Sequence, residues 1–355
     1  MSFLTTSGDD DSGTILLKHL VVCFLVTEEN MDNTWQAASL ALRAFRQFAE
    51  HKLELINISE NFTFRIINER GIPTHVLRVH RTNYHDRLSI LSELAWINSL
   101  SRCTKVAVPK VVMNDKAQYL TETTTDDGST RYCVVSQYVE GVELTDEDSV
   151  DRFHTLGVVA ATLHLHTLKW NKPPWFSRFT WDLEDAFGGN PRWGPWSAYL
   201  DTIDKKYLHA VEESVVTSLA NYGRTRDRFG LIHADMRLSN IIWSVNELQP
   251  TLIDFDDSGY GWFMYDLATT VSFFEHKEQV PDMLAMWLQG YESVRPLSQW
   301  DKGIIWSLVM FRRLLLLGWI QSHPMVPICQ QLEPIFVGDT LALADRFLKG
   351  NLTTF

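Results

Sequence analysis

The segment 231–257 concentrates polar residues whose types and spacing are suited to chemistry. His233 and Asp235 follow a short apolar run, and Asn240 comes five residues after Asp235. Asp254 ends a second apolar run, fourteen residues after Asn240. A carboxylate such as Asp235 can accept or orient a hydroxyl proton, while amide and carboxylate oxygens are the ligands that magnesium prefers. The pattern therefore indicates phosphoryl transfer, with Asp235 as base or orienter and with Asn240 and Asp254 as metal ligands.

Two neighbouring residues extend this candidate site. Arg237 lies two residues after Asp235, where a guanidinium can balance charge on the transferring phosphoryl group. We expect His233 to brace the loop through hydrogen bonds rather than to react. The alternative is that these residues are ordinary caps and surface groups. The elements occur together, in order and between apolar runs, which favours a catalytic role.

The composition limits the classes of function. The chain has 355 residues, of which 45% are hydrophobic and 21% charged, so it can bury a sizeable core in two or three domains or lobes. Its 32 basic and 44 acidic residues give a net charge of −12, which argues against a nucleic-acid partner and permits an amine-bearing small molecule. The four cysteines show no CxxC spacing, which argues against disulfides or structural zinc and favours a cytoplasmic location.

Two apolar runs need a structural interpretation. The run 15–26 is too short to cross a bilayer. The run 304–320 is longer, but Arg312 and Arg313 stand in its middle, so we interpret it as a buried helix with a polar stripe. The N-terminus is acidic where a secretory signal would be basic. We therefore predict no transmembrane segment and no membrane partner.

The pattern of predicted elements changes near residue 138. Upstream, short β runs separated by turn residues predict an antiparallel meander with one main helix. Downstream, helical periodicity dominates. The predicted helices are 34–50, 85–99, 146–168, 197–221, 262–275, 279–293, 298–321 and 328–348, and the predicted strands are 52–58, 63–68, 75–80, 106–112, 118–122, 132–138, 230–233, 240–243 and 251–255. We predict an α+β fold with a loosely ordered extension (1–30), a nucleotide-binding N-lobe (31–137), a hinge (138–143) and a mostly helical C-lobe with the catalytic loop and acceptor site (144–355).

Taken together, these motifs resemble the aminoglycoside phosphotransferase and choline kinase superfamily, nearest to its branch of type II homoserine kinases and stress-response kinase A. The segments that carry the resemblance are SENFTFRI (59–66), THVLRVHR (74–81), SILSELAWI (89–97), YVEGVEL (138–144), LHLHTLKW (163–170), HADMRLSN (233–240) and LIDFDDSGYGWFMYDLAT (252–269). The resemblance covers roughly residues 35–345. It implies a bilobal, protein-kinase-like fold with ATP and Mg²⁺ as cofactors.

The resemblance also implies two segments that enclose the nucleotide. A turn after the first predicted strand covers the phosphates, although it lacks the glycines of a protein-kinase loop, and a plain hairpin turn is the alternative. The hinge offers backbone groups to the adenine. The residues concerned are Glu60, Asn61 and Phe62 in the turn, and Gln137, Tyr138 and Val139 in the hinge.

Further roles follow from the same resemblance. Arg78 stands where many relatives have a lysine, and Glu93 matches the glutamate that pairs with it. An ordinary surface ion pair is the alternative there. Asp256 replaces the glycine of a protein-kinase DFG motif, and we place it in the predicted metal site. Asp257 is expected to brace the next loop, and Asp266 matches an aspartate that anchors the catalytic loop.

An insert rich in aromatic residues is the candidate acceptor side. An aromatic wall with interleaved carboxylates suits an amine or ammonium group. The alternative is that these rings fill a satellite core under a long loop. The tryptophans of the insert are Trp170, Trp175, Trp181, Trp193 and Trp196.

We therefore predict an ATP- and Mg-dependent kinase whose acceptor is a hydroxyl of a small molecule, such as an amino alcohol, a homoserine-like compound or an aminoglycoside-like sugar. A protein Ser/Thr kinase of the stress-response kinase A type is the first alternative. The second is a nucleotide-binding regulator without catalysis, and the complete set of Asp235, Asn240 and Asp254 argues against it. The sequence leaves the oligomeric state open.

Overall fold

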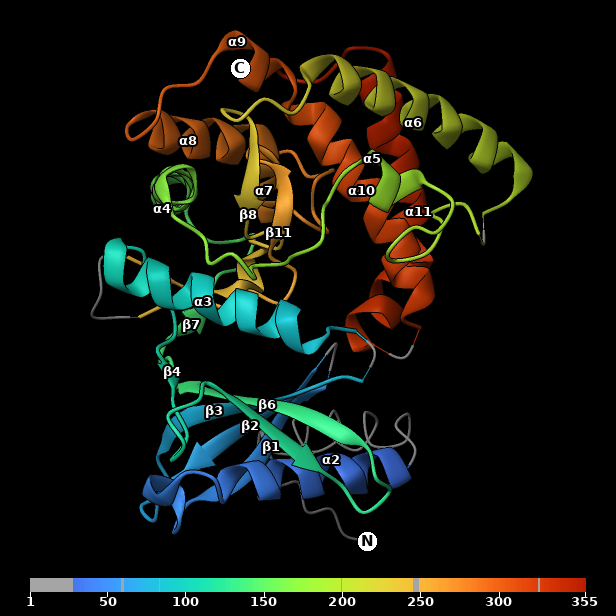
Figure 1. Ribbon diagram of the computed structural model, residues 1–355. Coiled ribbons are helices and arrows are strands. Elements are labelled where there is room, and N and C mark those ends of the chain that lie inside the picture. The colour runs from blue at the N-terminus through green and yellow to red at the C-terminus, as the bar shows by residue number, and fades with distance from the viewer. Residues whose placement is uncertain (1–27, 59–60, 83, 199, 245–248, 325) are drawn as a thin grey trace, which may run out of the picture.

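The computed structural model describes residues 28–58, 61–82, 84–198, 200–244, 249–324 and 326–355. Glu60 and most of the predicted extension 1–30 lie outside the described residues. Figure 1 shows a sheet with one long helix in the N-terminal part and a larger helical C-terminal part. This architecture agrees with the predicted α+β fold. The division into lobes at a hinge over 138–143 is kept as a proposal.

A six-stranded antiparallel sheet forms the N-terminal part, in the order β1-β2-β3-β6-β4, with β5 also paired to β6. Its strands alternate between the two faces, and Phe62, Phe64 and Ile66 of β2 all turn into the core. Five of the predicted strands are confirmed to within two residues, and the one predicted over 106–112 is reduced to β4. The strands are β1 (Lys52–Ile58), β2 (Asn61–Ile67), β3 (Pro73–His80), β4 (Val111–Val112), β5 (Leu120–Thr124) and β6 (Thr130–Gln137).

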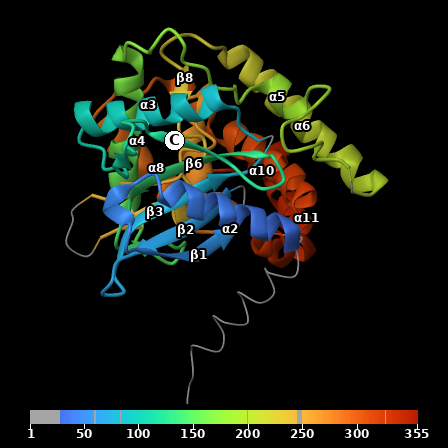
Figure 2. The ribbon, with the colours of Figure 1, turned by 60° about the horizontal axis from the view of Figure 1, so that its bottom comes forward.

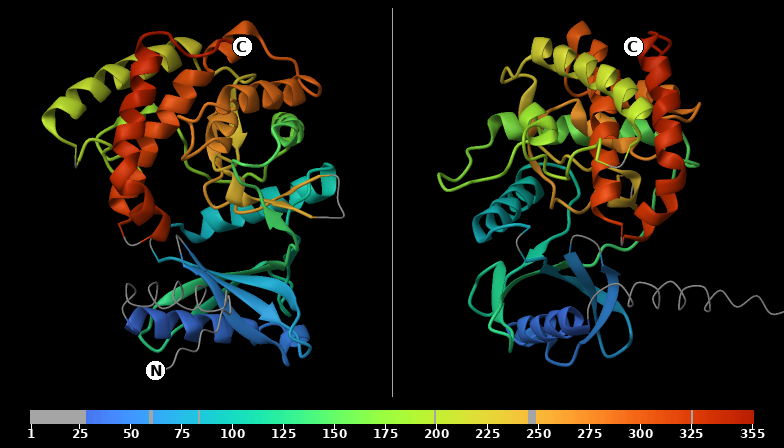
Figure 3. Two further views of the ribbon diagram at one scale, coloured as in Figure 1. Left: turned by 180° about the vertical axis from the view of Figure 1, so that it is seen from behind. Right: turned by 90° about the vertical axis from the view of Figure 1, so that its right-hand side faces the viewer.

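Two helices cover the two faces of this sheet. Helix α2 (Glu28–Leu42) lies along one face, where Ala37, Ala38 and Ala41 are fully buried and allow close packing (Figure 2). The predicted helix over 34–50 was placed too late, because the chain leaves the helix after Leu42 and buries two phenylalanines in the same core. Helix α3 (Arg87–Cys103) lies between the sheet and the C-terminal part (Figure 3). Its first turn is capped by Asp86, which accepts a hydrogen bond from the Ser89 N–H at 2.7 Å.

The C-terminal part is built from helices packed closely together. Helices α4 and α8 touch at Gly157 and Gly290, where an added Cβ would lie 1.9 Å from a backbone oxygen of the opposite helix. The predicted helix over 298–321 is two helices that meet at Ile304. The helices are α4 (Asp151–Lys169), α5 (Leu183–Phe187), α6 (Thr202–Tyr222), α7 (Tyr265–Thr270), α8 (Val280–Glu292), α9 (Gln299–Gly303), α10 (Ile305–Ser322) and α11 (Pro327–Leu348).

Two small strand pairs hold the polar loops of the candidate site. Strands β9 (Ile241–Trp243) and β10 (Thr251–Leu252) are antiparallel, and β7 (Val142–Glu143), at the end of the predicted hinge, pairs with β9. Strand β8 (Phe229–Ile232) pairs with β11 (Gly259–Trp262). The sequence did not predict β7 or β11, which are short and lack β-branched runs. The loops that leave β8 and β10 carry the predicted catalytic and metal-binding residues.

The long apolar run near the C-terminus forms a central helix. By length and composition alone, Gln299–Ser322 would qualify as a membrane span, yet 94% of its apolar window is buried inside the protein. Both Arg312 and Arg313 of α10 are buried as well, at 2% and 0% exposure. The interpretation of this run as a buried helix with polar members therefore agrees with the structure.

Candidate active site

One buried carboxylate, that of Asp266, holds the backbone of the loop that carries Asp235. Asp266, at the start of α7, is completely buried and accepts hydrogen bonds from the backbone N–H groups of His233 (3.1 Å) and Ala234 (2.7 Å). The ring of His164 contacts the same carboxylate at 2.9 Å. Ala234 has a left-handed backbone with φ of 66°, which is costly for a residue with a Cβ. Asp266 therefore stabilises the unfavourable backbone turn that directly precedes Asp235.

His233 braces the loop, as the sequence predicted. Its Nε2 lies 3.1 Å from the Ile253 backbone oxygen, and its Nδ1 accepts from the Asp235 N–H at 3.2 Å. Burial lowers the pKa of His233, so the neutral ring donates on one side and accepts on the other. The ring thereby links the Asp235 loop to the segment that carries Asp254.

Three side chains hold the carboxylate of Asp235. Its Oδ2 accepts from Asn240 Nδ2 at 2.7 Å and from Arg237 Nε at 3.1 Å. Its Oδ1 accepts from Arg312 Nη2 at 2.5 Å, a contact that the sequence did not predict. Burial alone would raise the pKa of Asp235, but the two guanidinium groups outweigh that effect and hold the pKa below its usual value. Asp235 is therefore ionised and fixed, which suits an orienter of a hydroxyl.

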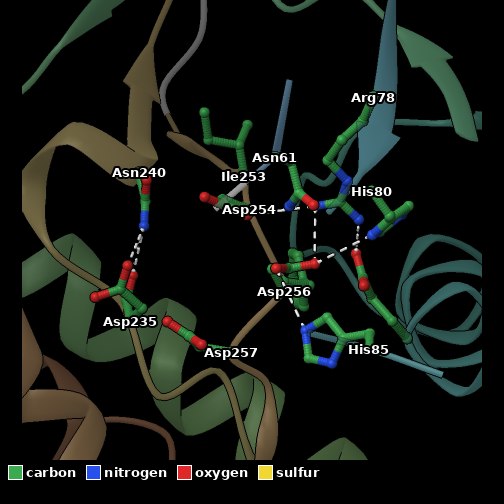
Figure 4. A network of polar contacts seen from close by, with 12 residues as sticks. Asn61, Arg78, His80, His85, Asp235, Asn240, Ile253, Asp254, Asp256 and Asp257 are labelled. Carbon is green, nitrogen blue, oxygen red and sulfur yellow. Dashed lines mark hydrogen bonds and ion pairs between the residues drawn. The ribbon is translucent and has the colours of Figure 1, made fainter. Parts of the chain in front are cut away.

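Asn240 and Asp254 are brought together by the pairing of β9 with β10. Asn240 Nδ2 donates to both the backbone oxygen and the carboxylate of Asp235, so its Oδ1 faces away from that carboxylate. Asp254 has a left-handed φ of 58°, and 41% of its side chain is exposed. Figure 4 shows its carboxylate between Asn240 and Arg78. Both side chains thus offer hard oxygen atoms on the same side of the loop.

These two oxygens fit a magnesium ion that is completed by nucleotide phosphates and water. Within the described residues there is no group of three or more His, Cys, Asp or Glu side chains that would hold a metal unaided. Desolvation by the surrounding protein atoms, followed by the nearby carboxylates of Asp256 and Asp235, raises the pKa of Asp254 to about 6. A cation bound at Asp254 would relieve this repulsion. The fit therefore supports a metal that arrives with the nucleotide.

Asp256 lies in different surroundings from those the sequence suggested. Its buried carboxylate is 3.6 Å from Arg78 Nη1, 3.7 Å from His80 Nδ1 and 3.3 Å from His85 Nε2 (Figure 4). Burial alone would raise its pKa, but Arg78 and the two histidines lower it well below the usual value. The role of Asp256 as a metal ligand stays a prediction, and the structure shows that Arg78, His80 and His85 already surround its carboxylate. Its position indicates that it holds Arg78.

The predicted pair of Arg78 and Glu93 is present and lies in the interior. Arg78 Nη2 donates to Glu93 Oε1, with the two side chains only 16% and 1% exposed. Arg78 Nη1 lies 3.3 Å from Asp254 Oδ1. The alternative of an ordinary surface pair is therefore wrong. Arg78 connects the sheet, helix α3 and the loop that carries Asp254.

We expect Arg78→Met to destabilise the fold as well as weaken nucleotide binding, because it leaves Glu93 and Asp256 buried without their guanidinium. Breaking one side of a buried pair costs about 3–5 kcal/mol. Urea unfolding measures this loss, and Arg78→Lys is the matched control, because it keeps the charge without the planar fork. The lysine variant should lie between wild type and Arg78→Met. A wild-type unfolding midpoint for Arg78→Met would contradict the assignment.

Part of the predicted phosphate-covering turn belongs to a strand. Asn61 and Phe62 are the first residues of β2, and Phe62 packs in the core of the N-terminal part. The Asn61 side-chain oxygen accepts from the Arg81 N–H at 3.3 Å. Figure 4 shows Asn61 close to Arg78 and Asp254. Of these two, only Asn61 therefore has a side chain near the site.

Two backbone N–H groups of the predicted hinge donate hydrogen bonds to other residues of the protein. The N–H of Gln137 donates to the Lys110 oxygen at 2.8 Å, and that of Tyr138 donates to the Thr74 oxygen at 3.0 Å. Neither N–H is therefore available to adenine in this arrangement. The prediction that backbone groups of Gln137, Tyr138 and Val139 meet the adenine stays a prediction for groups other than these two N–H donors. We keep the Val139 N–H as the proposed donor.

The aromatic insert is largely a core element. Trp181, Trp193 and Trp196 are 1%, 4% and 5% exposed, whereas Trp175 is 47% exposed. The alternative of a satellite core is therefore the better description of these rings. The insert still reaches the site, since Trp181 Nε1 donates to the Asp257 backbone oxygen at 2.7 Å. The tryptophans support the loop from behind and do not form an open acceptor wall.

Sequence reasoning gave no role to Arg178, which ties the insert to both parts of the site. Its Nε donates to the Ser258 oxygen at 2.5 Å, and its Nη1 reaches the Ser89 oxygen at 3.1 Å and the Ser89 hydroxyl at 3.0 Å. Its Nη2 donates to the backbone oxygens of Phe255 and Asp256. A buried arginine that binds carbonyl groups of distant segments has no periodic signal in a sequence.

Asp257 lies beside the proposed catalytic carboxylate. Tyr84 Oη donates to its Oδ1 at 2.9 Å, and Figure 4 shows the carboxyl group directed toward Asp235. Tyr84 also lines a cavity of 660 Å³ between the segments 80–89 and 177–179 and the start of β6. Asp235 does not line this cavity.

Comparison with known proteins agrees with this geometry. The family described as "Phosphotransferase enzyme family" matches residues 52–297. The solved structure of a microcompartment-associated aminopropanol kinase is 36% identical, has a TM-score of 0.80, and the match covers 88% of this chain and 97% of that chain. An amicoumacin kinase solved with AMP-PNP, Ca²⁺ and Ami has a TM-score of 0.68 at 19% identity, covering 91% of this chain and 96% of that chain.

A curated relative points the same way. Homoserine kinase of Gluconobacter oxydans (strain 621H) is 34% identical over 204 residues, which are 54% of this chain and 61% of that protein. The family match covers well over half of the chain, and the aminopropanol kinase resembles it along nearly its whole length. The predicted family and fold are thereby confirmed. The chain belongs to the phosphotransferase enzyme family and is a small-molecule kinase with an alcohol group as acceptor.

Proposed function

We propose that this kinase uses ATP with Mg²⁺ to phosphorylate the hydroxyl of an amine-bearing small molecule, with an amino alcohol as the preferred class. The observation that carries the proposal is the convergence of Asp235, Asn240 and Asp254 at the ends of β8, β9 and β10. A base or orienter beside two hard oxygen ligands is the arrangement that phosphoryl transfer requires. The identity of 36% with an aminopropanol kinase supports the acceptor class.

Each residue of the site has a proposed role. Asp235 holds the acceptor hydroxyl in line with the phosphoryl group and receives its proton as the new bond forms. Asn240 and Asp254 hold the magnesium ion, which supplies charge neutralisation at the phosphates when the nucleotide is bound. Arg78 binds a phosphate from the N-terminal side, and Arg237 balances charge beside Asp235. The catalytic contribution is chiefly positioning and electrostatic stabilisation.

The acceptor class is supported by the charge around Asp235. Asp257 is directed into the same space, and the whole chain carries a net charge of −12. A protonated amine two or three bonds from the reacting hydroxyl would lie between these carboxylates. No described residue specifically favours a protein acceptor. A cytoplasmic location remains part of the proposal, in keeping with the free thiols of Cys103 and Cys133.

ADP release with a panel of alcohols tests the proposal. The panel includes aminopropanol, ethanolamine, homoserine and the diols that match the first two without an amine. We expect kcat/KM for an amino alcohol to exceed that for its diol by at least about 100-fold, because a buried site for an amine rejects an analogue that lacks it. GTP in place of ATP and chelation of magnesium are the cofactor controls. Labelling confined to protein in an extract would overturn the acceptor class.

A further inference from the structure

Helix α10 carries two consecutive buried arginines within an otherwise apolar run. Successive helical residues point about 100° apart, so the two guanidinium groups leave the helix in different directions. Arg312 is 2% exposed and Arg313 is 0% exposed. Burying a guanidinium lowers the stability of the fold unless its charge is paired and its donors are hydrogen-bonded. Their partners decide what each one does.

Arg313 faces away from the candidate active site. Its Nη1 donates to the Glu275 carboxylate, and its Nε donates to the Thr340 hydroxyl at 2.8 Å. The guanidinium also lies 3.5 Å from the centre of the Phe336 ring and donates to the Phe336 oxygen at 3.2 Å. These contacts join α10 to α11 and to the loop after α7. Arg313 is therefore part of the helical core.

Arg312 faces the catalytic loop. Its Nη2 donates to Asp235 Oδ1 at 2.5 Å, and its Nη1 lies 3.5 Å from the Ala234 backbone oxygen. Its Nε donates to the Ser272 hydroxyl at 3.0 Å, and its Nη1 lies 3.4 Å from the Tyr265 hydroxyl. The planar group is thus fixed on both sides before it reaches Asp235. A fixed donor of this kind determines where the carboxylate oxygens point.

We propose that Arg312 is a positioning residue for phosphoryl transfer, an inference that rests on the proposed function of Asp235. By holding Oδ1 while Asn240 and Arg237 hold Oδ2, Arg312 stops rotation of the carboxylate and fixes the direction in which its remaining lone pair meets the acceptor hydroxyl. Oδ2 lies on the side of Asn240 and Arg237, where the metal and the phosphoryl group are expected. Arg312 acts through Asp235 and needs no contact with substrate.

The same helix also contacts the aromatic insert. The guanidinium of Arg312 lies 5.2 Å from the centre of the Trp193 ring, and Trp193 belongs to the aromatic insert. One and a half turns further along α10, Gly318 approaches Gly194 of the insert so closely that a Cβ would lie 2.5 Å from its oxygen. Helix α10 therefore supports the base and the insert as one rigid unit, which favours precise positioning.

Arg312→Lys and Arg313→Lys form a matched pair for the test. A lysine at 312 keeps the charge but cannot hold Asp235, Ser272 and Tyr265 together. We expect kcat of Arg312→Lys to fall about 100-fold, the scale of a small misplacement of a reacting group, while KM for MgATP changes less than about threefold. Arg313→Lys should lower the unfolding temperature with kcat per folded molecule close to wild type. Equal losses of kcat in both variants would overturn the proposal.

Chemical rescue of kcat distinguishes a positioning residue from a residue with a purely structural role. Added guanidinium at low millimolar concentration should restore part of the kcat of Arg312→Ala and none of that of Arg313→Ala. If the arginine variants fail to fold, Ser272→Ala removes one support of Arg312, and we expect it to lower kcat with an unchanged KM for MgATP. Wild-type kcat for Ser272→Ala, or no rescue of a folded Arg312→Ala, would contradict the role.

The result remains separable from that of the acceptor panel. If wild type phosphorylates a protein and no small molecule, the proposed acceptor class fails, yet the ratio of Arg312→Lys to wild type on that protein still tests Arg312. If wild type phosphorylates an amino alcohol and Arg312→Lys matches it, only the positioning role fails.

Discussion

Asp235→Asn is expected to lower kcat by about 10³-fold while MgATP binding stays nearly unchanged, on the scale of lost positioning and acid–base effects. The amide keeps the size of the carboxylate but lacks its charge and its affinity for a proton. One end of the amide also becomes a donor, and both carboxylate oxygens presently accept from Arg312, Arg237 and Asn240. The reaction is followed by ADP release, and nucleotide binding by calorimetry.

The measurement needs a control for stability, because Asp235 also neutralises two guanidinium groups. Urea unfolding of Asp235→Asn separates folded enzyme that is inactive from enzyme that is lost. His233→Asn, which changes a brace of the same loop, is the comparison variant and should retain more activity. If Asp235→Asn keeps most of its kcat, then Asp235 neither accepts nor orients the hydroxyl proton, and the proposed mechanism is wrong.

Asp254→Ala is expected to weaken MgATP binding by at least about tenfold, or 1.4 kcal/mol. The variant removes the carboxylate that is proposed to bind magnesium, whereas Arg78 keeps Glu93 and Asp256 as partners. Affinity for ATP without magnesium should be unchanged or higher, since one negative charge near the phosphates is gone. Calorimetric titration with and without the metal measures both quantities. An unchanged affinity for MgATP would remove Asp254 from the metal site.

The pH dependence of binding provides an internal control for this prediction. Desolvation by the surrounding protein atoms and the neighbouring carboxylates raise the pKa of Asp254 to about 6. A proton competes with a metal ion for the same oxygens, so MgATP affinity of the wild type should fall as the pH drops from 7 to 5. Asp254→Asn cannot titrate and should show a flatter profile. Parallel profiles would show that another group governs the fall.

The local parts of the site could be predicted because their geometry is short-range. Five residues separate Asp235 from Asn240, and one strand pair connects Asn240 to Asp254, so spacing along the chain predicts distance in space. The meander strands were predictable for the same reason, since period-two burial and turn residues are local signals. The pairing of Arg78 with Glu93 came from the family resemblance, and the structure adds that the pair is buried.

Other features depended on where distant segments meet. Asp256 lies two residues after the proposed metal ligand Asp254, and the end of β3 and the segment before α3 place Arg78, His80 and His85 around its carboxylate. The N–H groups of Gln137 and Tyr138 donate to Lys110 and to Thr74 of β3, and no local pattern reveals these partners. The aromatic insert was ambiguous from composition, because a ring in a core and a ring in a ligand wall have the same residue type.

The order of chemical groups along 233–257 is enough by itself to determine the class of reaction, because each group acts within a loop only a few residues long. The tertiary structure alone decided which cations surround those groups. Arg312 is 77 positions from Asp235 in sequence, and only the packing of α10 under the catalytic loop makes them neighbours. The neighbouring Arg313 is also a buried arginine, but its partners belong to the helical core. Side-chain direction on a packed helix is set by contacts with other helices, and those contacts leave no local mark in the sequence.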